Sequence, residues 1–154
     1  MPVLKPRVYN IPGVTVSLVR EPGVTLATRP QMKAPAEAAR ILAEYIGDID
    51  RETFVVALLS VRHRVLALNT VSVGCATQAL VHPREVFKPA ILAGAAAVIV
   101  CHNHPSGDPE PSAEDVALTR RLAAAGTLLG IEVLDHVILG ELGRFVSLKE
   151  RGAI

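Results

Sequence analysis

The chain has 154 residues, half of them hydrophobic, and carries a formal net charge of +1 at pH 7. This length suits one domain with a proper core, and the composition excludes an intrinsically disordered chain. The balanced charge gives no basic footprint for nucleic acid, the first residues lack the pattern of a signal peptide, and no apolar run approaches the roughly 18 residues of a membrane span.

Residues 1–33 are expected to form an N-terminal extension to a domain that covers residues 34–154. Within the extension, residues 14–20 and 24–28 alternate on either side of Glu21-Pro22-Gly23, which is a turn signal. Alternation around such a turn predicts a β-hairpin.

The domain is expected to open with a helix over residues 34–46, because Pro35 suits a first helical turn and Gly47 ends the apolar period. Residues 53–59 form an apolar run that predicts a strong strand. The polar turn at residues 62–64 then leads into residues 65–73, which we interpret as the antiparallel partner of that strand.

A second helix is expected to open at His82-Pro83, with Ala90, Ile91 and Gly94 on its packing side. The β-branched run at residues 98–101 predicts a buried strand.

Residues 114–125 predict a third helix that Gly126 ends, and residues 132–139 and 144–148 predict two closing strands. Hairpins and helices in this order indicate an α/β fold of the mixed α+β kind, not a doubly wound one.

The stretch from His102 to Asp115 carries the chemistry of the chain. In an extended chain residues i and i+2 point to the same face, so His102 and His104 can reach one point at the end of the buried strand. The prolines and glycine that follow force a loop, and Ser112 opens the next helix with Asp115 in its first turn. Two imidazoles and one carboxylate are three ligands, which is the number that a hydrolytic zinc site takes from protein.

A second interpretation of the same residues involves no metal. Ser112 and Asp115 also fit a capping box, in which both side chains satisfy free backbone N–H groups of a helix. The two histidines would then be ordinary loop residues.

The pattern H-x-H, seven residues, Ser, two residues, Asp resembles the signature of the JAMM (MPN-plus) zinc metallopeptidases. His102, His104, Ser112 and Asp115 occupy its four positions without a gap. The resemblance implies a curved mixed sheet flanked by helices, the cytidine-deaminase-like JAB/MPN fold. It also implies one Zn²⁺ per chain, bound by His102, His104 and Asp115.

Within that superfamily the chain resembles the RadC branch over about residues 34–150. The string HNHPSGDPxPSxxD, the LDH segment at residues 134–136 and the segment at residues 83–87 carry this resemblance. Full-length RadC proteins have a DNA-binding helix-hairpin-helix region ahead of this domain, whereas only some 33 residues precede it here. We therefore expect no specific DNA binding, despite the family's association with DNA repair.

The resemblance also implies a glutamate that acts as general base. Glu52, directly before the strand at residues 53–59, aligns best with the family's pattern, and Glu85 is the alternative. Alternatively, Glu52 is a solvated turn residue without a catalytic role, and Glu85 only stabilises the N-terminus of its helix. Ser112 is expected to donate a hydrogen bond to the oxyanion of the reaction.

The remaining candidates are expected to support the fold. Cys75 and Cys101 show no metal spacing and should stay reduced in the cytoplasm, where we expect this protein, and Cys101 should face away from His102. His136 is interpreted as a core residue or as a support for a metal ligand, in preference to a fourth ligand.

The leading hypothesis is a zinc-dependent hydrolase that cleaves an amide or isopeptide bond of a peptide or protein substrate. The alternative is a DNA-repair-associated or protein-interaction module in which zinc is structural. The tripeptide His102-Asn103-His104 is the only feature that suggests an HNH nuclease, so this interpretation is rejected. The sequence indicates no membrane partner and no oligomeric state.

Overall fold

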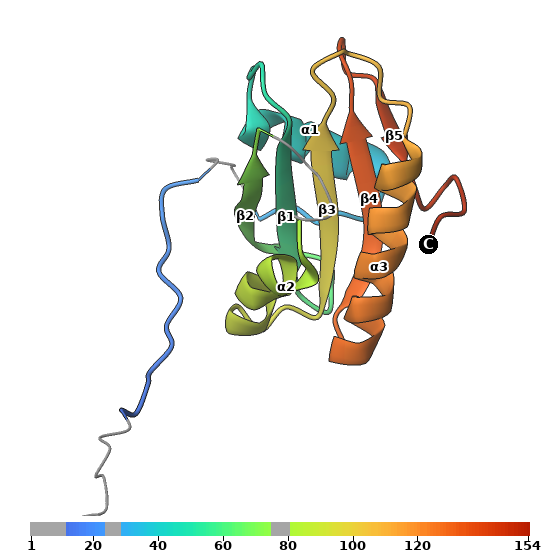
Figure 1. The fold of residues 1–154 in the computed structure, drawn as a ribbon. Helices are drawn as coiled ribbons and strands as arrows, with labels where there is room; N and C mark the ends of the chain where they lie inside the picture. The colour runs from blue at the N-terminus through green and yellow to red at the C-terminus, as the bar shows by residue number, and fades with distance from the viewer. Residues whose placement is uncertain (1–11, 24–28, 75–80) are drawn as a thin grey trace, which may run out of the picture.

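The computed structural model describes residues 12–23, 29–74 and 81–154, and the remaining residues lie outside this description (Figure 1). Its strands form one sheet in the order β2-β1-β3-β4-β5. The elements along the chain are α1 (Pro35–Ile46), β1 (Thr53–Leu59), β2 (Val65–Val73), α2 (Pro83–Leu92), β3 (Ala97–Asn103), α3 (Ala113–Leu129), β4 (Glu132–Leu139) and β5 (Phe145–Ser147).

The sheet is mixed, since β3 and β4 are parallel and the other neighbouring pairs are antiparallel. Helix α1 covers one face, and α2 and α3 cover the other (Figure 1). The predicted mixed α/β fold is therefore confirmed, and the expected bounds of β1, β2 and β4 agree with the structure.

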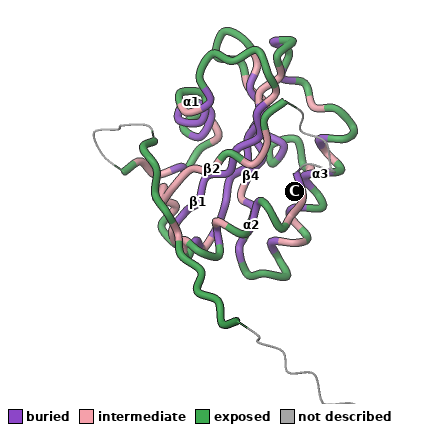
Figure 2. The backbone as a smooth tube through the Cα atoms, turned by 60° about the vertical axis from the view of Figure 1, so that its left-hand side comes forward, coloured by how far each residue is buried: buried purple, intermediate pink, exposed green. Residues whose placement is uncertain are grey.

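Two apolar cores lie on the two faces, and the buried strands run between them (Figure 2). Along β3, Ile99 and Cys101 belong to the core beneath α1, whereas Val98 and Val100 belong to the core beneath α2 and α3. Strand alternation then directs His102 toward the α3 side, where its ring stacks on Phe54 at a centroid distance of 5.9 Å.

Helix α3 continues four residues beyond its predicted end. Gly126 does not end the helix but lies inside it, where an added Cβ would stand 2.4 Å from the carbonyl oxygen of Ile131. The helix ends at Gly130, whose φ of 69° is left-handed. Gly126 thus serves close packing, and Gly130 serves the cap.

Two other expectations on the second half of the domain were wrong in part. Ala90 packs into the core as predicted, but Ile91 is 56% exposed and Gly94 lies beyond the helix. Strand β5 is shorter than residues 144–148, since it pairs with β4 only through Phe145–Ser147.

The N-terminal segment does not form the strand that was predicted over residues 14–20. Residues 12–23 are extended and mostly exposed, and among the described residues no strand pairs with them. Alternation alone therefore did not suffice, because a strand needs a partner for its backbone groups. The second half of the predicted hairpin, residues 24–28, lies outside the described residues.

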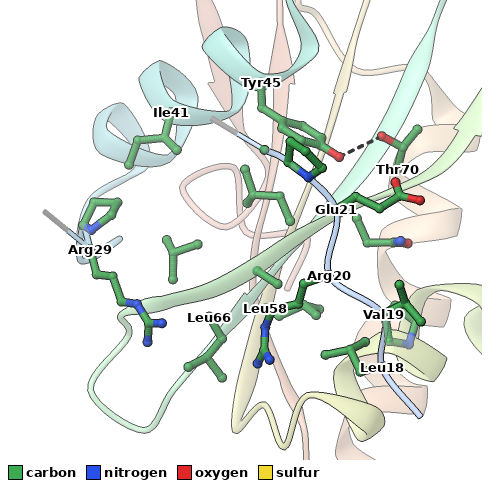
Figure 3. Close-up of a pocket in the computed structure, with 18 residues that line it drawn as sticks. Leu18, Val19, Arg20, Glu21, Arg29, Ile41, Tyr45, Leu58, Leu66 and Thr70 are labelled. Carbon is green, nitrogen blue, oxygen red and sulfur yellow. Dashed lines mark hydrogen bonds between the residues drawn. The ribbon is translucent and has the colours of Figure 1, made fainter. Parts of the chain in front are cut away.

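A groove of about 580 Å³ lies between this segment, α1 and β2 (Figure 3). Tyr45 on α1 and Thr70 on β2 hydrogen-bond to each other at 3.2 Å across its wall. None of the candidate catalytic or metal-binding residues named above lines this groove. No helix in the described part of the chain is long and apolar enough to cross a membrane.

Candidate metal centre

Four side chains with metal-binding atoms converge where β3 ends. Glu52, His102, His104 and Asp115 each offer one ligand atom, and these atoms all lie within 4.8 Å of one another. Glu52 directly precedes β1, the histidines lie in and just after β3, and Asp115 lies in the first turn of α3. The structure thus brings together the three predicted ligands and the preferred candidate for the base.

The register of the sheet explains why Glu52 joins this cluster. Phe54 on β1 pairs with His102 on β3 in antiparallel fashion. Continuing that register by two residues places Glu52 beside His104. The fifty residues between Glu52 and His102 therefore separate two neighbours in space.

The spacing of the donor atoms suits a small tetrahedral cation. His102 Nε2 lies 3.0 Å from His104 Nε2 and 3.3 Å from Asp115 Oδ1, and His104 Nε2 lies 3.5 Å from Asp115 Oδ2. Two ligands at the usual zinc distance of about 2.0–2.1 Å would stand roughly 3.3 Å apart in a tetrahedron. Glu52 Oε1 is slightly farther out, at 3.7 Å from His102 Nε2. The residues present therefore fit Zn²⁺ with Glu52 beside the three ligands.

Asp115 serves both the helix cap and the cluster. Its backbone N–H donates to Ser112 Oγ at 3.1 Å, and its Oδ2 accepts from the Ser112 backbone N–H at 2.7 Å. Burial raises the pKa of Asp115, but the hydrogen bond and charge of His102 and the bonds from Ser112 lower it more, so the pKa lies well below its usual value. The capping box therefore leaves Asp115 within reach of the cluster, so a cap and a metal ligand are compatible roles for this carboxylate.

The ring of His104 is held by the loop that follows it. Its Nδ1–H donates to the carbonyl oxygen of Asp108 at 2.8 Å, because a carbonyl can only accept. The loop turns at Gly107, whose φ of 84° favours glycine. The other ring nitrogen, Nε2, therefore faces the cluster.

Asn103 holds the backbone on both sides of Glu52. Its Oδ1 accepts from the Thr53 backbone N–H at 2.7 Å, and its Nδ2 donates to the Arg51 carbonyl at 3.0 Å. One amide fixes the two peptide groups that flank the candidate base.

Glu85 lies apart from the cluster. Both of its carboxylate oxygens accept from Lys88 Nζ at 3.0 Å on the exposed side of α2. Its role on the helix surface is the one expected if Glu52 is the base.

Ser112 is exposed and beside the cluster, and its Oγ accepts the capping bond from Asp115. That bond uses a lone pair, so the hydroxyl hydrogen remains for another acceptor. Cys101 is buried in the core on the α1 side, as predicted, and burial raises the pKa of its thiol. Cys75 lies outside the described residues.

His136 lies wholly buried beneath His102. Its Nε2 is 2.8 Å from His102 Nδ1, and burial lowers its pKa well below the usual value. The sequence interpretation of His136 as a support was compatible with this position, but Thr119, which contacts the other ring nitrogen, was missed. A polar residue four positions after Asp115 on the buried face of α3 was the available signal.

The fold and this donor set define a protein with a candidate metal centre at the edge of a mixed sheet. The RadC-like JAB domain family matches residues 32–153 of the chain. This match covers most of the sequence, including all four residues of the cluster. The chain belongs to the family of RadC-like JAB domains.

Several similar bacterial proteins carry the name UPF0758 protein. The one from Rubrobacter xylanophilus is 50% identical over 139 residues, which are 90% of this chain and 58% of that protein. The one from Desulfitobacterium hafniense is 51% identical over 126 residues, 82% of this chain and 55% of that protein. The one from Desulforamulus reducens is 44% identical over 149 residues, 94% of this chain and 65% of that protein. The chain thus spans less than two thirds of the length of these relatives.

Proposed function

We propose that this chain is a zinc-dependent hydrolase of the JAMM type, which cleaves an amide or isopeptide bond in a peptide or protein. The observation that carries the proposal is the convergence of two imidazoles and two carboxylates within 4.8 Å. Three of these groups match the ligand count of hydrolytic zinc sites, which leave one position open. The fourth, Glu52, is then free for acid–base work.

His102, His104 and Asp115 would hold the metal. A bound Zn²⁺ supplies Lewis acidity, which polarises a carbonyl group and lowers the pKa of water to about 7. Imidazole nitrogen with carboxylate oxygen is a donor set that zinc accepts well.

Glu52 takes the proton from the attacking water and later returns it to the leaving amine. The side chain of Glu52 is 29% exposed and its Oε1 lies 3.7 Å from His102 Nε2, so it borders both the cluster and solvent. Proton transfer requires a base within hydrogen-bond reach of the water, and a carboxylate at this position supports that role. The two bonds from Asn103 keep Glu52 there.

Ser112 stabilises the oxyanion of the tetrahedral intermediate. Its hydroxyl lies at the start of α3, and the capping bond leaves the hydrogen available. A donor that is already in place when charge develops lowers the barrier without reorganisation.

The experiment compares protein termini in a bacterial lysate after incubation with three purified proteins. These are the zinc-loaded wild type, Glu52→Gln and His104→Ala. The proposal expects new N-termini or newly freed lysine ε-amino groups with the wild type only. A zinc-loaded wild type that releases no more of them than His104→Ala would contradict the peptidase proposal and favour a structural zinc in a binding module.

A further inference from the structure

A continuous chain of hydrogen bonds runs from α3 through the core to the metal cluster. Thr119 Oγ1 donates to the backbone carbonyl of Asp115 at 2.6 Å, and it contacts His136 Nδ1 at 2.5 Å. On the far side of that ring, His136 Nε2 lies 2.8 Å from His102 Nδ1. Thr119, His136 and His102 are each fully buried, so water does not compete for these bonds.

The hydrogen atoms of this chain can be assigned one by one. A hydroxyl has one hydrogen, and that of Thr119 goes to the Asp115 carbonyl, which can only accept. Thr119 Oγ1 must therefore accept from His136 Nδ1–H. Full burial disfavours a charged ring at His136, and a neutral imidazole carries one ring hydrogen, so His136 Nε2 has a lone pair and accepts from His102 Nδ1–H.

The opposite assignment is disfavoured by one contact. If Thr119 donated to His136 instead, the hydroxyl and carbonyl oxygens would face each other at 2.6 Å without a hydrogen between them. His102 would then carry its hydrogen on Nε2 and could not offer that atom to a metal. The Asp115 carbonyl thus selects between two states of the whole chain.

We propose that Thr119 and His136 are positioning residues that fix the ring hydrogen of His102 on Nδ1, so that Nε2 faces the cluster as the metal-binding atom. The inference rests on the proposed function only in that the cluster binds a metal. His104 reaches the same state through Asp108, as described above. The two Nε2 atoms lie 3.0 Å apart, and with both ring hydrogens on Nδ1 each would direct its lone pair at a cation bound in the cluster.

The arrangement also links metal binding to the packing of the domain. Asp115 is itself one of the proposed ligands, and its own backbone carbonyl anchors the chain of bonds that orients His102. Helix α3 therefore supplies one ligand directly and orients a second through β4. Partners of this kind typically change metal affinity by about 10- to 100-fold when they are removed.

The first test measures the ring hydrogens directly. Long-range ¹H–¹⁵N correlation spectra of the ¹⁵N-labelled, metal-free full chain at neutral pH distinguish the two imidazole forms, and His136→Gln assigns the signals. We expect both His102 and His136 to carry hydrogen on Nδ1. A metal-free wild type in which His102 carries it on Nε2 would overturn the proposal.

The second test uses a matched pair at Thr119, with zinc affinity measured by competition with a chromophoric chelator. Thr119→Val keeps the shape but leaves His136 Nδ1–H without its acceptor, so affinity should fall about 10- to 100-fold. Thr119→Ser keeps the hydroxyl and should restore most of the affinity. A folded Thr119→Val protein that binds zinc as tightly as the wild type would refute the positioning role.

A third comparison covers the ring itself. In His136→Gln the side-chain oxygen can still accept from His102 Nδ1–H, whereas in His136→Leu nothing can. The glutamine variant should therefore bind zinc more tightly than the leucine variant, and equal affinities would count against the inference.

The failure of this inference can be distinguished from the failure of the proposed function. If these results hold but no peptide bond is cleaved, only the proposed function fails. If cleavage occurs while His102 carries its hydrogen on Nε2, only this inference fails.

Discussion

Replacing Glu52 by Gln should remove catalysis while leaving the fold and the metal in place. Gln has nearly the same shape but cannot take a proton from water, so only the chemical step should suffer. Loss of a general base costs about 10²- to 10⁴-fold in rate, which corresponds to about 2.7–5.4 kcal/mol in the activation barrier. Glu52 is the outermost of the four donor groups, and zinc content should therefore be unchanged.

The same substitution should not destabilise the metal-free protein. The ligand atoms of Glu52 and Asp115 lie within 4.8 Å of each other, and two negative charges at about 4 Å repel by about 1 kcal/mol even in bulk water. Removing one charge relieves this repulsion. For a domain of this size 1 kcal/mol corresponds to a Tm change of roughly 2–4 °C, so the Tm of Glu52→Gln should equal or exceed that of the wild type.

Glu85→Gln is the matched control, because it makes the same chemical change outside the cluster. Glu85 pairs with Lys88 on the surface of α2, and losing this charge near a helix start costs about 0.3–1 kcal/mol of stability at most. The assay is the cleavage rate at bonds found by the comparison of termini, together with zinc content and Tm. An inactive Glu85→Gln and a fully active Glu52→Gln would refute the assignment of the base, although the metal site would stand.

Three further outcomes are expected. Asn103→Ala releases the peptide groups on both sides of Glu52, so the cleavage rate should fall about 10- to 100-fold with zinc retained, and an unchanged rate would show that Asn103 does not position the base. Gly126→Ala places a Cβ against the Ile131 carbonyl, so thermal unfolding should report a loss of about 1–3 kcal/mol, whereas an unchanged Tm would refute the close contact. The balanced charge predicts no duplex DNA binding at micromolar or tighter affinity in physiological salt, and fluorescence anisotropy that detects it would revive a repair role.

The convergence of His102, His104 and Asp115 could be predicted from the sequence because their geometry is local. Alternation at the end of a strand aligns His102 with His104, and a helix start fixes Asp115. Both rules depend only on neighbouring residues and not on the tertiary packing of the domain. The strands at residues 53–59, 65–73 and 132–139 were equally accessible, since long apolar or alternating runs leave little ambiguity.

The supporting contacts could not be predicted in this way because they depend on tertiary packing. Thr119 and His136 are 17 residues apart and meet only because α3 lies on β4. Gly126 and Gly130 are both plausible ends of a helix in the sequence, and only the approach of Ile131 distinguishes them. The strand expected over residues 14–20 is absent for a related reason, because an alternating pattern does not by itself decide whether a segment pairs with another.

The most direct test of the central claim is the zinc content of the purified full chain, measured by elemental analysis beside His104→Ala. If His102, His104 and Asp115 hold the metal, the wild type should contain one zinc per chain, and His104→Ala should lose most of it while remaining folded by circular dichroism. Equal zinc in the two folded proteins, or none in a wild type purified with zinc present, would contradict the metal centre described here.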